Sequence, residues 1–187
     1  MKMTLFADAS FCHKTGAGGW GAWAKRDDWP KGEFLGGPLD CELRSSTTAE
    51  LCGIACALWH CFDVGRLSGV SSLMVQCDNT EALSLIGHML PTAFVYGSGD
   101  RRDQQHLPAV KPGRLRKLSI VENEALTVIA TAVGDTRVLL RHVKGHTDRD
   151  TGRAWVNGHC DAEARRHMEV LRKQRGGMPT KGRRNSK

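Results

Sequence analysis

The chain has 187 residues, of which 40% are hydrophobic and 25% are charged, and this composition predicts one compact domain with a hydrophobic core. It excludes a chain that is disordered throughout, and no apolar run approaches the roughly 18–20 residues that a membrane span needs. The N-terminus lacks the apolar segment of a signal peptide, so we expect a soluble, cytoplasmic protein whose seven cysteines are reduced thiols.

The net charge of +7 is concentrated at the C-terminal end of the chain. Residues 172–187 hold seven of the 27 basic residues and no acid, which leaves 20 bases against 20 acids in the rest of the chain. A basic tail on a neutral body suits an electrostatic contact with a polyanion such as nucleic acid. A solvated terminus that keeps the protein soluble is the alternative.

The first 40 residues predict three consecutive strands. Lys2 to Ala9 alternates apolar and other side chains and is predicted to end near Asp8. A glycine-rich turn follows at residues 16–19, and residues 20–25 and 32–39 predict two further strands that glycine bends. Three strands joined by short connections indicate an antiparallel meander.

The rest of the chain alternates predicted helices and strands. The predicted elements, in order, are a helix over 48–62, a strand over 73–77, a helix over 80–89, an irregular basic segment over 91–117, a helix from the capping box at Ser119 to Val133, a strand over 138–143, and a helix from Asn157 or Asp161 to Lys173. This order predicts an α/β fold in which a five-stranded mixed sheet carries helices on both faces. We expect one domain over residues 1–173, with 91–117 as a basic loop insertion and 174–187 as a basic, disordered tail.

Four acidic residues stand near the predicted ends of these elements. Asp8 falls at the end of the first strand, Asp78 at the end of the fourth, Glu50 in the first turn of the first helix and Asp161 at the start of the last helix. If the first and fourth strands are neighbours, these carboxylates converge. Like charges so close together are costly unless cations lie between them, and Mg²⁺ prefers oxygen ligands.

Each acid also has a structural alternative. Glu50 completes a capping box with Thr47, Asp78 can cap the helix after it, and Asp161 can favour a helix dipole.

Cysteine, histidine and tryptophan residues also have alternative interpretations. The i, i+4, i+8 spacing of three side chains is compatible with a zinc site but favours core packing, and the tryptophans favour core or rim positions over base stacking. The three side chains with that spacing are Cys52, Cys56 and His60.

Five motifs, in this order, resemble the type 1 ribonuclease H family, and the resemblance covers nearly all of residues 1–173. The motifs are Phe6-Ala7-Asp8-Ala9-Ser10 with Gly16-Ala17-Gly18-Gly19-Trp20-Gly21-Ala22, Thr47-Thr48-Ala49-Glu50-Leu51, Cys77-Asp78-Asn79, Val143-Lys144-Gly145-His146, and Asn157-Gly158-His159-Cys160-Asp161-Ala162-Glu163-Ala164.

The resemblance implies an endonuclease that hydrolyses the RNA strand of RNA–DNA hybrids with two Mg²⁺ ions, or with Mn²⁺ in their place. It implies that Asp8, Glu50, Asp78 and Asp161 bind the metal ions. It also gives His146 a catalytic role in moving a proton or releasing product. The expected partner is the hybrid itself, and we expect a monomer, although the sequence does not fix the oligomeric state.

Several positions depart from the family pattern where the nucleic acid is recognised. Ala9 replaces a common glycine, Lys14 a common asparagine, and Ser45 to Thr47 an asparagine-containing segment. Such positions sense 2′-hydroxyls and the shape of the minor groove. Two alternatives therefore stay open: a structure-specific DNA nuclease related to the resolvases, and a module of the same fold that binds nucleic acid without cutting it.

Overall fold

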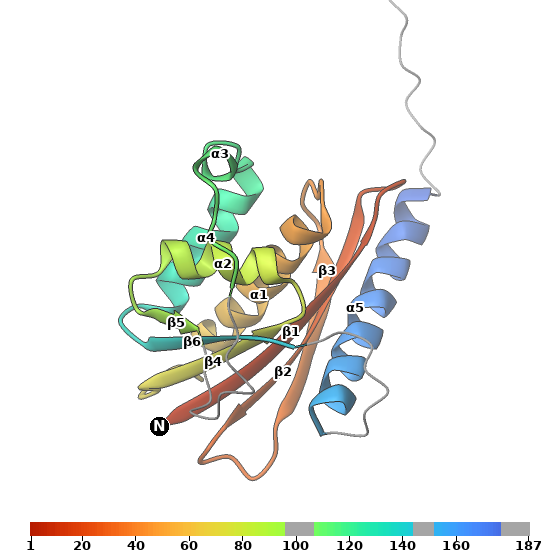
Figure 1. Cartoon of the computed structure of the whole chain (residues 1–187). Helices are drawn as coiled ribbons and strands as arrows, with labels where there is room; N and C mark the ends of the chain where they lie inside the picture. The colour runs from red at the N-terminus through yellow and green to blue at the C-terminus, as the bar shows by residue number, and fades with distance from the viewer. Residues whose placement is uncertain (96–106, 144–151, 177–187) are drawn as a thin grey trace, which may run out of the picture.

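The computed structural model describes residues 1–95, 107–143 and 152–176, which form one mixed sheet with helices on both of its faces (Figure 1). The strands are β1 (Lys2–Cys12), β2 (Ala17–Arg26), β3 (Glu33–Leu39), β4 (Ser72–Cys77), β5 (Ala93–Val95) and β6 (Arg137–His142). The helices are α1 (Ser46–Asp63), α2 (Thr80–Met89), α3 (Pro112–Leu115), α4 (Ile120–Val133) and α5 (Gly152–Gly176). The predicted fold class is confirmed.

The sheet has the strand order β3-β2-β1-β4-β6-β5. The first three strands form the predicted antiparallel meander, and β4, β6 and β5 continue the sheet in parallel from the other edge of β1. Phe6 of β1 pairs with Gln76 of β4, so β4 ends alongside the middle of β1. This register brings residues after β4 level with the second half of β1.

The prediction that β1 ends near Asp8 is wrong. Pairing with β2 continues until Cys12 lies opposite Ala17, so the hairpin carries β1 well past the end of β4. Asp8 therefore lies in the second half of β1, where the strand pairs with β2 but no longer with β4. The sequence does not show this extension, because Asp8 and Ser10 are polar where a buried strand would carry apolar side chains. Both residues line a polar cleft.

The prediction of five strands is also wrong, because the described residues form a sheet of six. Residues 93–95, within the segment predicted to be irregular, pair in parallel with β6 as β5. Three residues are too few for an alternating pattern to appear in the sequence. The same segment contains the single turn of α3, which begins at Pro112, and residues 96–106 lie outside the described ranges.

The last helix is longer than predicted at both ends. α5 begins at Gly152 and continues to Gly176, past the predicted domain boundary at residue 173. Arg175 in its last turn donates to the carbonyl oxygen of Gly16 at 2.6 Å and pairs with Asp40 at 2.8 Å. These contacts hold the end of the helix against the β1–β2 hairpin. The rest of the predicted tail lies outside the described residues.

Two apolar layers hold the helices on the sheet. The larger layer joins α1 and the sheet to α2 and α4, and α4 packs on the outer side of α1. The smaller layer consists of Phe6 with Val156 and Cys160 of α5, on the opposite face. None of the helices in the described ranges combines the length and the hydrophobicity that crossing a bilayer requires.

Two glycines of β2 let α5 lie directly on the sheet. A Cβ atom on Gly19 would overlap the backbone of Ala164, and one on Gly21 would overlap the carbonyl oxygen of Cys160. A side chain at either position would therefore push the helix away. Asp8 pairs with Gly21 across the β1–β2 ladder, so the close approach that these glycines allow brings α5 near Asp8.

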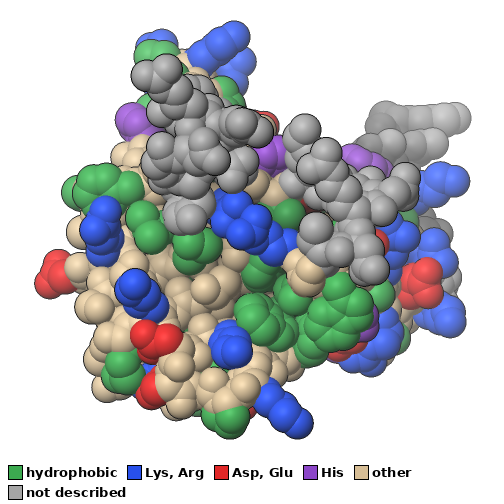
Figure 2. All heavy atoms as spheres, turned by 60° about the horizontal axis from the view of Figure 1, so that its bottom comes forward, with side chains coloured by type: hydrophobic (Ala, Val, Ile, Leu, Met, Phe, Trp, Pro, Cys, Tyr) green, Lys and Arg blue, Asp and Glu red, His purple; other side chains and the backbone are tan. Residues whose placement is uncertain are grey.

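Aromatic rings are exposed where α5 begins. The Trp155 side chain is 55% exposed, and its ring lies 4.0 Å from that of His159 and 5.8 Å from that of Phe34, measured between centroids. Figure 2, which brings this end of α5 forward, shows a group of hydrophobic side chains with Lys and Arg side chains around it. Trp20, by contrast, belongs to the main core. These two tryptophans thus occupy the expected rim and core positions.

We predict that Gly21→Ala destabilises the fold by at least about 2 kcal/mol, because the added methyl group overlaps the α5 backbone. Gly158→Ala is the matched control, since Gly158 lies in α5 with no atom near its missing side chain. The control should be neutral or more stable by about 1 kcal/mol, as alanine favours a helix. Urea denaturation measures both, and equal stabilities for the two variants would contradict the packing described here.

Candidate active site

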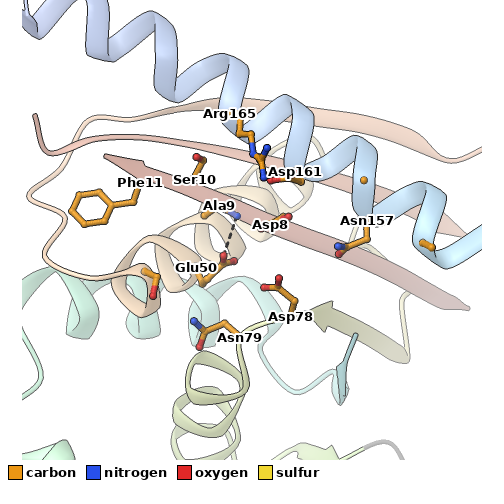
Figure 3. Close-up of a pocket in the computed structure, with 13 residues that line it drawn as sticks. Asp8, Ala9, Ser10, Phe11, Glu50, Asp78, Asn79, Asn157, Asp161 and Arg165 are labelled. Carbon is orange, nitrogen blue, oxygen red and sulfur yellow. Dashed lines mark hydrogen bonds and ion pairs between the residues drawn. The ribbon is translucent and has the colours of Figure 1, made fainter. Parts of the chain in front are cut away.

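A polar cleft of about 610 Å³ opens where β4 ends, between β1, the N-terminal part of α1 and the first half of α5. All four acids that the sequence singles out line it (Figure 3). Asp8, Glu50 and Asp78 point toward one another from three different elements, and Asp161 approaches from α5. The cleft therefore gathers residues that are 153 positions apart in the sequence, from Asp8 to Asp161.

Asp8 reaches the cleft from the middle of β1. Its side chain is only 7% exposed because α5 packs over the adjacent strand. Alternate residues of β1 face opposite sides of the sheet, so Asp8 shares a face with Phe6, which packs against α5. The side chain thus lies between the last residues of β4 and the helix.

Glu50 lies in the second turn of α1 and not in the first turn. Ser45 caps this helix by accepting the backbone N–H of Thr48 at 3.1 Å. The capping-box interpretation of Glu50 is therefore wrong. Instead, the Glu50 carboxyl accepts the backbone N–H of Ala9 through Oε1 at 3.2 Å, which ties α1 to β1. The side chain is 5% exposed.

Asp78 follows β4 directly, as predicted. The next helix is capped by Asn79, whose side chain accepts the backbone N–H of Ala82 at 2.9 Å, so the capping interpretation of Asp78 is wrong. The backbone carbonyl oxygen of Asp78 lies 3.0 Å from Nε2 of His142 at the end of β6. Because two neighbouring strands end here, the Asp78 side chain lies at the open edge of the sheet.

Asp161 lies in the third turn of α5, since the helix begins nine residues earlier, at Gly152. The helix-dipole interpretation is therefore wrong, because the dipole acts within the first turn. An ion pair of 2.9 Å joins its Oδ1 to Nε of Arg165, one turn further along. Arg165 is thus a cleft residue that the sequence did not single out, although the i, i+4 spacing is visible there.

Burial and crowding raise the pKa values of the two innermost acids. Loss of solvent, followed by the charges of Asp78 and Asp161, raises the pKa of Asp8 to about 7. Burial, followed by Asp8 and Asp78, raises the pKa of Glu50 well above its ordinary value. The cleft therefore disfavours the fully ionised set of acids unless positive charge enters it.

Cys77, which is buried beside Glu50 and does not line the cleft, is a second residue of the site to which sequence analysis gave no role. Its thiol donates to Oε2 of Glu50 at 3.5 Å, and its sulfur accepts the backbone N–H of Asn79 at 3.3 Å. The side chain is 1% exposed. One potential ligand atom each from Glu50, Cys77 and Asp78 lie within 4.8 Å of one another. The sequence feature that could have identified Cys77 as a site residue is its position directly before Asp78.

The donor set suits a hard divalent cation. Carboxylate oxygens are the preferred ligands of Mg²⁺, and Asp8, Glu50, Asp78 and Asp161 offer them from four elements. Arg165 is the only basic residue among the described lining residues, and it pairs with Asp161. A bound cation would neutralise the negative charge of the two buried acids, Asp8 and Glu50.

The other sequence-predicted site residues lie elsewhere. His146 falls within residues 144–151, outside the described ranges. The proposed zinc ligands do not form a cluster, because Cys52 is packed in the core whereas His60 is exposed. Core packing is therefore confirmed for Cys52 and, in part, for Cys56, but not for His60.

The sequence matches no protein-family model and no curated protein. Three solved structures share its architecture. The N-terminal RNase H domain of a Mycobacterium tuberculosis protein has a TM-score of 0.57 at 13% identity, over 93% of this chain and 98% of that one. LC11-RNase H1 in complex with RNA/DNA hybrid has a TM-score of 0.58 at 11% identity, over 90% and 98%. RNase H1 from Halobacterium salinarum has a TM-score of 0.52 at 12% identity, over 91% and 99%. The chain has the ribonuclease H fold.

We predict that Asp8 makes this ribonuclease H fold less stable as pH rises from about 4 to 7 in EDTA. Over that range the unfolded chain loses the Asp8 proton, at an ordinary pKa of 3.8, while the folded chain keeps it until about 7. The stabilisation present below pH 4 is thus lost progressively, by at most about 4 kcal/mol. Asp8→Asn should lack this pH-dependent part of the free energy of unfolding, and it should be more stable than the parent at pH 8. Urea denaturation at pH 5 and pH 8 measures it, and identical pH dependence of parent and variant would contradict it.

We also predict that the Cys77 thiol stabilises the buried Glu50 carboxyl. Cys77→Ser keeps a donor and an acceptor at this position, whereas Cys77→Ala removes both. The alanine variant should be less stable than the serine variant by about 1–2 kcal/mol, because a buried polar group loses its partner. Urea denaturation of the two variants in EDTA tests this, and an alanine variant as stable as the serine variant would show that the thiol only fills space.

Proposed function

We propose that this chain is an endonuclease that hydrolyses the RNA strand of RNA–DNA hybrids with two divalent cations, Mg²⁺ or Mn²⁺. The observation that carries the proposal is the convergence of four acids, two of them almost fully buried, in one cleft of a ribonuclease H fold. A structure of similar fold, LC11-RNase H1, was determined in complex with RNA/DNA hybrid. The fold and the cleft together support a hybrid-cutting nuclease.

In this proposal Asp8, Glu50, Asp78 and Asp161 hold the cations. When bound, divalent cations supply activation of the attacking water and stabilisation of the leaving 3′ oxygen, which gives 5′-phosphate and 3′-hydroxyl products. The chain itself fixes the ligands beforehand. Glu50 is oriented by the N–H of Ala9 on one oxygen and by the Cys77 thiol on the other.

Other residues of the cleft suit the binding of a phosphodiester. Arg165 places positive charge at the rim beside Asp161, where it attracts an anionic phosphate. Asn157 is buried in the cleft wall, and the Ser10 and Ser46 hydroxyl groups line the same space. His146 retains its proposed role in proton transfer or product release, since an imidazole titrates near pH 6.5.

A structure-specific DNA nuclease is the second candidate, and one observation favours keeping it. The Thr47 hydroxyl donates to Glu81 at 3.0 Å, and the Ser45 hydroxyl caps α1. Both groups, at positions expected to sense RNA, thus bond within the protein. Recognition of 2′-hydroxyls must then come from other groups, or the substrate is DNA.

A panel of substrates separates these candidates. A labelled RNA–DNA hybrid is compared with a DNA duplex, a DNA junction and double-stranded RNA, each with Mg²⁺ and with EDTA. We expect cleavage of the RNA strand of the hybrid alone, and only with Mg²⁺. Cleavage of the junction instead would favour the second candidate, and binding of the hybrid without any cleavage would leave a binding module.

We predict that Asp78→Asn lowers hybrid cleavage by at least about 10³-fold without unfolding the chain, because a neutral amide holds cations poorly. Asp135→Asn is the matched control, since this aspartate is exposed in the turn before β6. Single-turnover cleavage and circular dichroism measure the two effects. Cleavage by Asp78→Asn at the rate of the control would remove Asp78 from the active site.

A further inference from the structure

Two thiols touch between α1 and the connection that leads into it from β3. Cys41 lies on the connection from β3 to α1, Cys52 lies in α1 itself, and their sulfur atoms share a hydrogen bond of 3.8 Å. All seven cysteines of the chain are free thiols. Cys61, Cys77 and Cys160 are buried. The contact between Cys41 and Cys52 is therefore a feature of the reduced protein.

A groove of about 410 Å³ gives access to these sulfurs. It lies between α1, α4 and residues 38–41, and its lining is mostly apolar. Cys41 and Cys52 both line it, and so does Cys56, one helical turn beyond Cys52. Cys41 is the more accessible member of the touching pair, since Cys52 is only 6% exposed. A small molecule can thus reach Cys41 first.

We propose that Cys41 and Cys52 form a dithiol site that undergoes thiol–disulfide exchange with low-molecular-weight disulfides such as oxidised glutathione. The Cys41 thiolate, having released its proton to solvent, attacks one sulfur of the small disulfide and forms a mixed disulfide as one glutathione thiolate leaves. The Cys52 sulfur then attacks the Cys41 sulfur, loses its proton and releases the second glutathione. Two protein thiols are oxidised to one disulfide, and one small disulfide is reduced to two thiols.

The surroundings of the two sulfurs assign these roles. The hydrogen bond with Cys52, helped by the positive charge of Arg175, lowers the pKa of the Cys41 thiol below its ordinary value. Exchange proceeds through the thiolate. Cys41 is thus the attacking group, and Cys52 resolves the mixed disulfide that forms next to it.

Closing the bond requires little movement. A disulfide bond is about 2.0 Å long, so the two sulfurs must approach by roughly 1.8 Å. The connection that carries Cys41 is held at Asp40 by Arg175 and at Ser45 by its cap on α1. The new bond would join this connection to α1, the helix that carries Glu50. It would lie between Asp40 and Ser45, where the connection is already held in place.

The experiment treats the full chain with oxidised glutathione in EDTA and follows it by intact mass and peptide mapping. We expect a loss of two hydrogens per chain, a Cys41–Cys52 peptide link, and a melting temperature raised by about 5 °C or more, which reduction reverses. A link between any other two cysteines, or a stable mixed disulfide on the unaltered chain, would overturn the proposal.

Single-cysteine variants separate the two roles. Cys52→Ala should stop at a glutathione mixed disulfide on Cys41, and Cys41→Ser should form neither product at these positions. Cys56→Ser is the matched control, because Cys56 lines the same groove without touching Cys41, and it should still form the Cys41–Cys52 link. Circular dichroism checks that each variant is folded. Loss of the link in the Cys56 variant, or a glutathione mixed disulfide on Cys52 in the Cys41→Ser variant, would contradict the assigned roles.

Discussion

Repulsion among four acids, two of them buried, is the main cost that this fold has to offset. Asp8 and Glu50 have lost nearly all contact with solvent, and each feels the charge of Asp78. Like charges in a dry cleft cost free energy unless protons or cations neutralise them. A fold that keeps such a cluster must obtain the compensating stability elsewhere.

That stability comes from the two layers that hold the sheet between α1 and α5. The larger layer is an ordinary apolar core, but the smaller one depends on the absence of side chains in β2. Gly19 and Gly21 let the α5 backbone approach the strand next to β1. The same approach that packs the helix also sets Asp161 near Asp8. The stability of the fold and the assembly of the cleft therefore both depend on the packing of α5 against β2.

Local patterns in the sequence predicted some of this arrangement and missed the rest. The apolar run before Asp78 marked the end of a strand, and the capping box at Ser119 marked the start of α4, because both signals act over a few residues. Residues 152–158 include two glycines, which disfavour a helix locally, and the predicted start at Asn157 or Asp161 falls later than the start of α5 at Gly152. Tertiary packing against β2 overrides that local weakness.

Contacts between distant segments were beyond the reach of such patterns. The three-residue strand β5 is too short to leave a periodic signal, and it exists because β6 offers a free edge. The bond from Cys77 to Glu50 and the contact of Cys41 with Cys52 join a strand or a connection to a helix. Side-chain spacing along α1 favoured core packing and was compatible with a zinc site, since periodicity shows a shared face but not what lies opposite it.

Anomalous diffraction from a crystal of the unaltered chain grown with Mn²⁺ would show whether the four acids bind metal, because it locates the ions independently of any activity. We expect two anomalous peaks about 3.5–4 Å apart, each within bonding distance of carboxylates among Asp8, Glu50, Asp78 and Asp161. A cleft without a peak at millimolar Mn²⁺, or peaks only at other acids of the chain, would contradict this expectation.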